Sequence, residues 1–545
     1  MDEVAFVYWL YAMMKMNKHV YYFICAIASA LLLIISWQPF SFFVAGFVAF
    51  VPLFFLEKKI REQKDHSGIF FFYVSLSLFL WNAGSTFWIW NATVFGAIAA
   101  FLVNMLMMSL PFIIYHRMQK RLYEKQAEWV FICSWMAFEY WHLNWDLSWP
   151  WMMLGNIFSS VPSIVQWYEY TGVFGGTFWI VYVNFMLFRY IKAFNERSRF
   201  LNFSRAFNLL FFGIFAPIFL SFYLQQNYHE NKNPLTVLVV QPNVDPYTDK
   251  FGNMSPLEQT QKMLRIAESK IDSTVQLVMF PETAIVGSLN EDMLDANESI
   301  QLIRNFIQKH PGIQILSGAD TYKFYKNKNE RSSTARKYEG DEYYDVYNTA
   351  LLIDATPKIQ IYHKSKLVPG VEKMPFPKLL GFLGKFAVDL GGTNGSLGSS
   401  SEAEVLSIQH HNFVAPIICY ESIYGEYVGN YISKNANLLC VVTNDGWWGN
   451  TPGIHQHFDY ARLRAIETRR YVARSANTGI SGFVDAQGNV LAHSEWWKED
   501  AIKMTVNLNT QTTFYVEYGD YLAKLALILT LLNIIQNWRK PEFED

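Results

Sequence analysis

The sequence contains few charged residues and few cysteines. Asp, Glu, Lys and Arg make up 17% of the 545 residues, where soluble globular domains average about 25%. The net charge is −2, so no basic field indicates nucleic acid as a partner. The four cysteines, Cys25, Cys133, Cys419 and Cys440, are too few for a disulfide framework. These shortages argue against a nucleic-acid-binding protein and against a small disulfide-stabilised domain.

Hydrophobic residues are abundant instead. They account for 51% of the chain, and aromatic residues alone for 17%. Apolar runs of bilayer length lie at about 20–37, 40–56, 69–90, 93–115, 129–144, 171–191, 207–225 and 520–537. We therefore predict a membrane domain of about seven transmembrane helices over residues 1–225. A C-terminal transmembrane helix and a short cytoplasmic tail are expected over residues 520–545.

Basic residues follow only every second apolar run. The connections after the first, third and fifth runs carry almost no Lys or Arg. The positive-inside rule places the basic connections in the cytoplasm, and therefore residues 226–519 on the other side of the membrane. The basic residues are Lys58, Lys59, Arg61, Lys64, Arg117, Lys120, Arg121, Lys125, Arg189, Lys192, Arg197, Arg199 and Arg205, with Arg539 and Lys540 in the tail.

The sequence pattern of residues 226–519 predicts a separate domain. Short strands and helices alternate in it, which indicates an α/β fold. Strands are expected at 235–240, 275–280, 313–317, 347–353, 358–362, 413–418, 437–442, 471–475, 480–484 and 502–507. Helices are expected at 255–271, 298–309, 422–433 and 457–470. The charged stretch 323–345 is expected to form a solvated loop or a hairpin tip.

Three of the expected strands end on side chains that are suited to acyl transfer. Cys419 ends an apolar run, and Glu282 and Lys364 end two others. A thiol needs a base to become a nucleophile, and a carboxylate can serve as that base. A lysine can stabilise a developing oxyanion. A lone cysteine on a strand is ordinarily a small core residue, so Cys419 taken alone indicates little.

The three segments together carry a family resemblance. Pro281-Glu282-Thr283, Tyr362-His-Lys364 and Cys419-Tyr-Glu421 resemble the Glu-Lys-Cys motifs of the nitrilase, or carbon–nitrogen hydrolase, superfamily. The stretches 364–372, 443–449 and 455–457 resemble the membrane-embedded branch of that superfamily, the apolipoprotein N-acyltransferases. The resemblance implies a multi-pass α-helical membrane domain plus an α/β, nitrilase-like αββα sandwich over residues 226–519.

The resemblance also implies a reaction and its participants. Catalytic Cys419 would take an acyl chain from a phospholipid as a thioester, with Glu282 as base and Lys364 stabilising the oxyanion. The acyl chain would then pass to the N-terminal amine of the diacylglyceryl-cysteine of an apolipoprotein. No metal and no other cofactor is implied. The expected partners are phospholipid, diacylglyceryl-modified apolipoproteins and the bacterial inner membrane, with a monomeric enzyme whose catalytic domain faces the periplasm.

Further site residues are carried over by the same resemblance. Glu372 and Glu421 match essential carboxylates of the branch, and Tyr420 matches the aromatic residue after the nucleophile. The chain departs from the branch before Glu372, where it has Pro-Gly-Val instead of Pro-Phe-Gly. Phe251 stands where many members have tryptophan, and we expect it to bind substrate.

The tryptophans around the connection 141–172 admit two interpretations. They are typical of an aromatic belt at the lipid headgroups, and equally of a lip through which lipid enters the site. On the second interpretation Trp149 would contact substrate. Trp447 and Trp448 of the later motif could be core residues, whereas exposed they would bind substrate at a mouth that rests on lipid.

A His-x-His pattern at His455 and His457, followed by Asp459, suggests a metal site. No further Cys or His cluster accompanies it in the sequence. We therefore expect these residues to position the loop 444–449 rather than to bind a metal.

Two other functions remain compatible with parts of the sequence. A membrane-tethered amidase acting on a small soluble amide would share the Glu-Lys-Cys residues but would need only one membrane anchor. A transporter or receptor would leave more charged residues within its membrane spans than this chain has.

Overall fold

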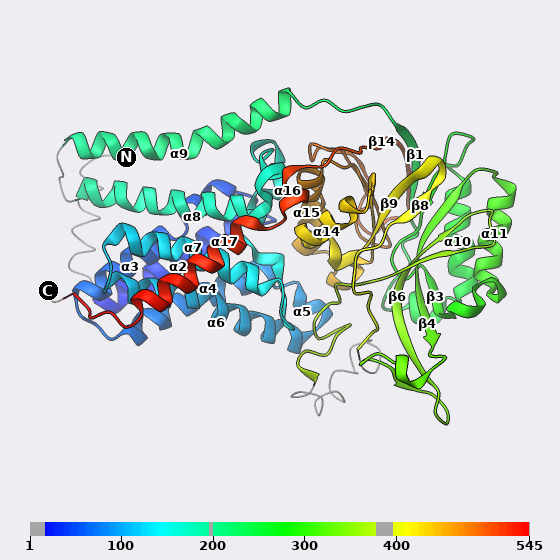
Figure 1. The fold of residues 1–545 in the computed structure, drawn as a ribbon, viewed down its shortest axis with the longest axis horizontal. Coiled ribbons are helices and arrows are strands. Elements are labelled where there is room, and N and C mark those ends of the chain that lie inside the picture. The colour runs from blue at the N-terminus through cyan, green and yellow to red at the C-terminus, as the bar shows by residue number, and fades with distance from the viewer. Residues whose placement is uncertain (1–16, 196–199, 378–395, 544–545) are drawn as a thin grey trace.

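The computed structural model describes residues 17–195, 200–377 and 396–543. Figure 1 shows two parts side by side along the longest axis, a helical bundle and an α/β part. The C-terminal helix α17 returns to the bundle and packs against α7. Arg197 and Arg199, expected in a cytoplasmic connection, lie outside the described residues.

The bundle contains the apolar runs as helices. Among the described residues, five helices are long and apolar enough to cross a membrane, namely Lys18–Ser36, Ser67–Thr86, Val94–Gln119, Tyr168–Phe194 and Ser204–Gln226. The C-terminal helix α17 is apolar but shorter, with 17 residues. The helices are α2 (Lys18–Ser36), α3 (Val51–Glu62), α4 (Ser67–Thr86), α5 (Ile89–Ala92), α6 (Val94–Gln119), α7 (Glu124–His142), α8 (Tyr168–Asn195), α9 (Phe200–Gln226) and α17 (Tyr521–Asn537).

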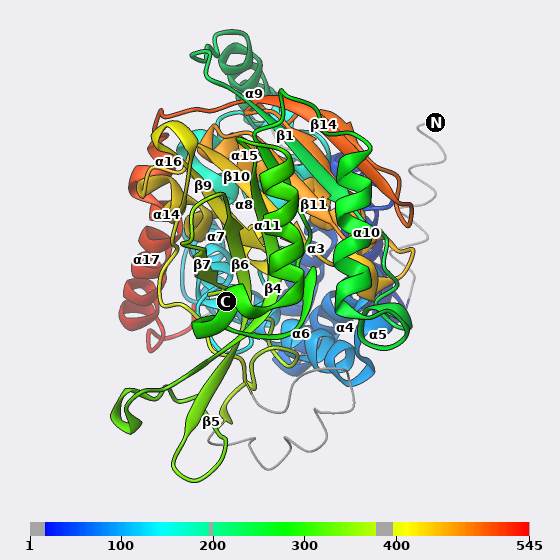
Figure 2. The same cartoon turned by 90° about the vertical axis from the view of Figure 1, so that its right-hand side faces the viewer.

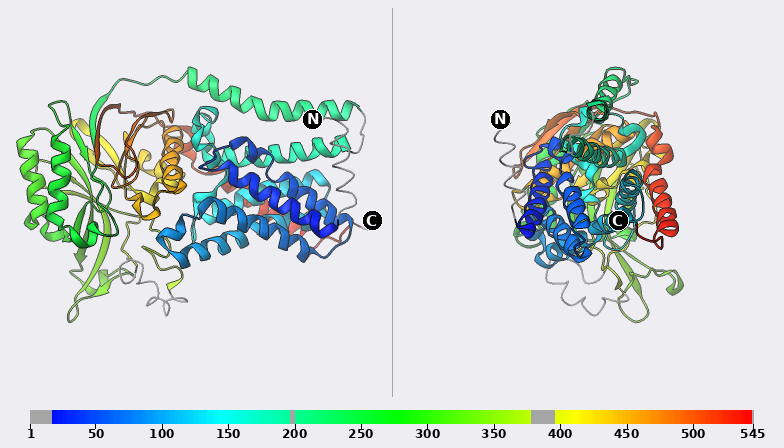
Figure 3. Two further views of the ribbon diagram at one scale, coloured as in Figure 1. Left: turned by 180° about the vertical axis from the view of Figure 1, so that it is seen from behind. Right: turned by 90° about the vertical axis from the view of Figure 1, so that its left-hand side faces the viewer.

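The helix α9 lies at the edge of the bundle. It packs against α8, and only 6% of its most hydrophobic 18-residue segment is buried inside the protein. Figure 3 shows α9 beside α8 and the extended chain that leads from its end to the α/β part. The exposed side chains of α9 are largely Phe and Leu, as expected of a helix that faces lipid.

The second apolar run forms two short elements instead of one long helix. A 3-10 turn spans Phe43–Phe47, and the 12-residue α3 begins at Val51. Pro52 suits the first turn of a helix and cannot continue one, which explains the break. Asn184 of α8 satisfies the freed backbone, because its amide donates to Gly46 O and accepts from Phe50 N–H, each at 2.8 Å.

The α/β part contains two sheets. The first has eight strands in the order β14-β1-β2-β4-β6-β5, with β3 beside β4 and β7 beside β6. The second has the order β13-β12-β11-β10-β9-β8. The strands are β1 (Pro234–Gln241), β2 (Leu277–Met279), β3 (Ile285–Asn290), β4 (Gln314–Phe324), β5 (Arg336–Lys337), β6 (Tyr343–Ile353), β7 (Gln360–His363), β8 (Leu406–Ile408), β9 (Asn412–Ile418), β10 (Leu438–Thr443), β11 (Val472–Ala476), β12 (Gly482–Val484), β13 (Val490–His493) and β14 (Asp500–Asn507).

The sheets pack face to face between two layers of helices. Leu238 and Val240 of β1 face a core formed with α10 (Pro256–Glu268) and α11 (Glu298–Lys309). Val237 and Val239 face the opposite core, which contains the second sheet. Because β1 is buried on both faces, its apolar run is continuous rather than alternating. Figure 2 shows α10 and α11 in front of the first sheet.

The helix α15 (Pro452–Thr468) joins the two parts of the molecule. It packs against α8 and against α14 (Gly425–Ser433), and almost all of its side chains are buried. Its Gln456 accepts hydrogen bonds from the indole nitrogens of Trp88 and Trp151 at 3.2 and 2.7 Å. The expected αββα sandwich is therefore confirmed, with its last helical layer seated on the bundle.

Several elements differ from the expected boundaries. The strands β4 and β6 extend into the stretch 323–345 and pair with each other as far as Phe324 and Tyr344. The strands β3, β8 and β13 were not expected, because they have only three to six residues and lack a continuous apolar run. The helix α15 begins five residues before the expected start, with Pro452 in its first turn.

Candidate active site

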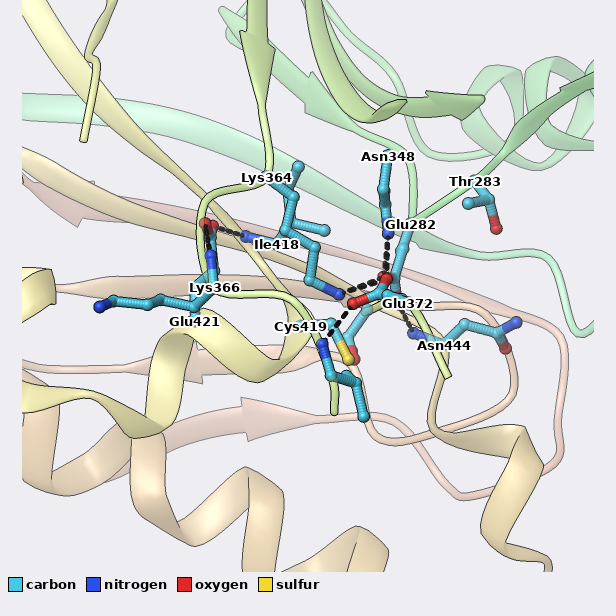
Figure 4. Close-up of polar contacts among 12 residues, drawn as sticks. Glu282, Thr283, Asn348, Lys364, Lys366, Glu372, Ile418, Cys419, Glu421 and Asn444 are labelled. Atoms are coloured by element: carbon cyan, nitrogen blue, oxygen red, sulfur yellow. Dashed lines mark hydrogen bonds and ion pairs between the residues drawn. The ribbon is translucent and has the colours of Figure 1, made fainter. Parts of the chain in front are cut away.

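Cys419 lies where the strand β9 ends. It opens a 3-10 helix, Cys419–Ile423, and has a φ of 49°. This left-handed conformation is unfavourable for a residue with a side chain, and such residues concentrate at functional sites. Figure 4 shows the sulfur facing the cluster of Lys364, Glu282 and Glu372.

Glu282 follows β2 and is 7% exposed. Its Oε1 accepts hydrogen bonds from Asn348 Nδ2 at 2.8 Å and from Lys364 Nζ at 3.3 Å. Its Oε2 accepts from the backbone N–H of Asn444 at 3.0 Å. Burial opposes its ionisation, but Lys364, Asn348 and Lys250 outweigh burial and lower the pKa of Glu282. Glu282 is therefore an ionised carboxylate, as a general base must be.

Lys364 follows β7 and is buried between two carboxylates. Its Nζ donates to Glu372 Oε1 at 2.8 Å in addition to Glu282. Burial favours the neutral amine, but Glu372 and Glu282 raise the pKa of Lys364 above its usual range. The site therefore keeps a fixed positive charge where water is excluded, which suits the stabilisation of an oxyanion.

The thiol of Cys419 rests in its neutral form. Burial and the nearby negative charge of Glu282 raise its pKa, and Lys364 only partly offsets them. A thiolate therefore forms only when the proton has somewhere to go. The site thus combines the neutral thiol of Cys419, the ionised carboxylate of Glu282 and the positively charged ammonium of Lys364.

Glu372 holds the lysine in place from a short turn. Its Oε1 also accepts from Asn348 Nδ2 at 3.0 Å, and its Oε2 accepts from Val368 N–H at 2.8 Å. Gly370 has a φ of 81°, which permits the tight turn that precedes Glu372. The altered Pro-Gly-Val segment thus still brings the carboxylate to Lys364.

Glu421 binds the backbone on both sides of the site. It is fully buried, and it accepts hydrogen bonds from Ile418 N–H at 2.8 Å and Ser365 N–H at 2.7 Å. These two donors are the neighbours of Cys419 and Lys364 in the chain. Tyr362 OH donates to the same carboxylate at 2.6 Å. Glu421 therefore fixes the nucleophile relative to the lysine.

His457 connects three segments beneath Cys419. Its Nδ1 lies 2.8 Å from Asp445 Oδ1, and its Nε2 lies 2.9 Å from Ser422 Oγ. Ser422 Oγ also donates to the carbonyl of Cys419 at 2.7 Å. Burial and Arg474 lower the pKa of His457, so the imidazole is neutral. His457 contacts the loop that it was expected to position, and the described residues contain no group of three or more metal-ligating side chains.

Several candidate substrate-binding aromatics meet beside Cys419. The rings of Tyr420 and Trp149 stack 6.2 Å apart, and Trp149 stacks on Trp151 at 5.5 Å. Trp448 lies 4.7 Å from Trp88, which extends this group to the end of the bundle. The side chain of Phe251 lies outside the described part of the chain.

Trp447 does not join this group among the contacts of the described residues. Its ring packs on Tyr247 at 5.4 Å, and its carbonyl accepts from Tyr247 OH at 2.8 Å. Sequence reasoning missed Asn348, whose amide joins Glu282 to Glu372. No local pattern marked Asn348, because it lies within the strand β6 and its two partners are far away in the sequence.

The sequence pattern of the family described as carbon–nitrogen hydrolase matches residues 237–514. The chain therefore belongs to the carbon–nitrogen hydrolase family. The pattern of the apolipoprotein N-acyltransferase N-terminal domain matches residues 29–186. With both domains in one chain, the prediction of an acyltransferase of the apolipoprotein N-acyltransferase type is confirmed.

Full-length relatives carry the same description. An apolipoprotein N-acyltransferase of Chlorobaculum tepidum is 28% identical over 95% of this chain and 97% of its own length. One of Borreliella burgdorferi is 24% identical over 90% of each chain. Among solved structures, an amidase of Nesterenkonia sp. is 16% identical, covers 53% of this chain and 95% of its own, and has a TM-score of 0.35.

Proposed function

We propose that Cys419, Glu282 and Lys364 transfer an acyl chain from a phospholipid to the N-terminal amine of a diacylglyceryl-cysteine on an apolipoprotein. The observation that carries this proposal is that the three side chains, from the ends of separate strands, meet at one site, with Glu282 and Lys364 buried and Cys419 partly exposed. The catalytic domain would comprise residues 226–519. Residues 1–225 and 520–545 would form the membrane part, and one chain would supply the whole site.

The first step forms a thioester. Glu282 takes the proton of the Cys419 thiol while the sulfur attacks the ester carbonyl of the phospholipid. The ammonium of Lys364 stabilises the tetrahedral oxyanion. The carbon–oxygen bond of the ester then breaks, and Glu282 returns the proton to the departing lysophospholipid hydroxyl.

The second step forms an amide. The amine of the apolipoprotein attacks the thioester carbonyl and gives its proton to Glu282. The carbon–sulfur bond breaks, and Cys419 regains a proton as the N-acylated lipoprotein leaves. Water must be excluded from the thioester, because hydrolysis would turn the enzyme into a phospholipase. The aromatic rings around Tyr420 and Trp149 favour an acyl chain over water.

The distribution of basic residues supports a catalytic domain on the periplasmic side of the bacterial inner membrane. Arg117 and Arg121, at the end of α6, bind the backbone carbonyls of Trp538 and Lys540 at 3.2 and 2.8 Å. Figure 1 shows this end of the bundle opposite the α/β part. Positive charge concentrates in cytoplasmic connections, so the α/β part would lie outside.

The decisive experiment is intact-mass analysis after incubation with phospholipid. The wild-type protein is expected to gain the mass of one acyl chain, and Cys419→Ala is expected to gain none. Cys440→Ala is the matched control, because Cys440 is buried in the neighbouring strand β10 and its substitution should leave the adduct intact. An acyl adduct on Cys419→Ala, or none on the wild type, would contradict the proposal.

A further inference from the structure

Lys250 is a buried lysine that the proposed reaction does not use. Its side chain comes from the segment Asp249–Asn253 and is 3% exposed. The Nζ donates to the backbone carbonyl of Glu282 at 3.1 Å and to the hydroxyl of Thr283. An ammonium is costly to bury without negative partners, so its place beside Glu282 calls for a physical reason.

Asp320 of β4 supplies a third carboxylate to the same region. It interacts electrostatically with Lys250, Glu282 and Glu372. Burial raises the pKa of Asp320 to about 6, and burial lowers the pKa of Lys250 to about 8. The site therefore brings together two lysines, Lys250 and Lys364, and three acidic side chains, Glu282, Asp320 and Glu372.

Lys250 contacts the backbone of Glu282. With Pro281 and Thr283 it also lines a cavity of about 10 Å³. A cavity of that size holds about one water molecule. The contacts of Lys250 with the Glu282 carbonyl and the Thr283 hydroxyl give it a route by which to act on the base.

We propose that Lys250 is a positioning residue that fixes the backbone of Glu282 and balances the negative charge of this base. The proposal rests on the proposed function, because it assigns Glu282 the role of general base. Lys364 contacts the carboxylate of Glu282, whereas Lys250 contacts its backbone carbonyl. Glu282 thus has one cation beside its carboxylate and another beside its backbone carbonyl.

The consequence is a pH dependence with a definite sign. The charged and titratable groups around Glu282 are Lys250, Lys364, Asp320, Glu372 and Cys419. Loss of a positive neighbour makes the carboxylate of Glu282 harder to ionise, which moves the acid limb of the acylation rate to higher pH. Asp320 has no charge to lose on that limb, because its pKa of about 6 lies above the range in which Glu282 is protonated.

The test is the rate of thioester formation as a function of pH in the full-length protein with phospholipid. For Lys250→Met we expect the acid limb to move up by about one pH unit, which makes acylation about tenfold slower on that limb. For Asp320→Asn we expect the limb to stay in place, because Asp320, with a pKa of about 6, is already protonated at the pH of that limb. Lys262→Met on α10 is the matched control, since Lys262 pairs at the surface with Glu499 and should leave the limb unchanged.

The shift of the limb separates positioning from a merely structural role. A uniform loss of rate in Lys250→Met without a shift of the limb would overturn the inference, as would an equal upward shift in Asp320→Asn. If Lys250→Met does not fold, Lys250→Gln, which keeps a hydrogen-bond donor but removes the charge, must move the limb up. Failure of the wild type to form an adduct on Cys419 is a different result, because it would overturn the proposed function and this inference with it.

Discussion

At the scale of single residues, the site keeps the proposed base, Glu282, ionised and the proposed nucleophile, Cys419, neutral. Burial acts against ionisation of both Glu282 and Cys419, yet only Glu282 receives enough compensation to ionise. Lys364, the hydrogen bond from Asn348 and the charge of Lys250 make this difference. The resting site thus holds a neutral thiol beside an ionised base.

The substitution Glu282→Gln tests this division of roles. The amide cannot accept the thiol proton, so acyl-enzyme formation should fall by about 10² to 10⁴-fold. In the wild type, the lowered pKa of Glu282 keeps the base ionised to lower pH than an ordinary glutamate, so acylation should decline only below the usual range of a glutamate. Rapid-quench measurement of the thioester against pH would check both expectations.

Glu268→Gln is the control for this experiment, because Glu268 pairs with Lys309 at the surface of α10. Its acylation rate and pH profile should match those of the wild type. Retention of acylation in Glu282→Gln at a rate near the wild type would show that another group takes the proton.

At the scale of elements, α15 is the part of the hydrolase fold that meets the membrane domain. Its face toward the bundle carries polar side chains, and each finds a specific partner. Gln456 accepts from Trp88 and Trp151 and donates to the carbonyls of Ser85 and Gln38. His457, one residue later, reaches the nucleophile turn through Ser422. One helix thus links the end of the bundle to Cys419.

We expect Gln456→Leu to destabilise this junction. The substitution leaves two indole N–H groups and two carbonyls without their partner, and each such buried group costs about 1–3 kcal/mol. The melting temperature in detergent should fall, while the control Gln301→Leu on the exposed face of α11 should change stability by less than about 0.5 kcal/mol. Equal melting temperatures for Gln456→Leu and the wild type would show that water replaces the lost partners.

At the scale of the whole molecule, the basic residues of the bundle and the candidate active site lie at opposite ends. The basic ends of α3, α6 and α17 gather at one end of the bundle, and the α/β part is seated on the other. This arrangement would hold the site next to one leaflet, where both proposed substrates are anchored. It would also keep the acyl chain in an apolar environment from donor to acceptor.

Membrane-impermeant maleimide labelling of intact cells tests the orientation. In a background with Cys419→Ser, Glu339→Cys lies in the exposed hairpin between β4 and β6 and should react from the outside. Lys125→Cys lies at the exposed start of α7 and should react only after the cells are permeabilised. The reverse pattern would place the catalytic part in the cytoplasm.

The sequence predicted local structure where one residue type or one periodicity decides it. The run 235–240 is a strand because both faces of β1 are buried, and the helix expected at 298–309 is observed at Glu298–Lys309, where Asn297 caps its start. The short strands β3, β8 and β13 could not be predicted in this way. They exist because a neighbouring strand offers hydrogen bonds, which no local pattern records.

The sequence by itself predicted the chemistry proposed for this protein, because Glu282, Lys364 and Cys419 each stand at the end of a strand in a recognisable motif. It also determined the apolar bundle, because length and hydropathy are properties of a single segment. Only the tertiary structure decided that Asn348, Lys250 and Asp320 surround the base. Their contacts join segments far apart in the chain, and burial then gives each charge an effect that it would lack in water.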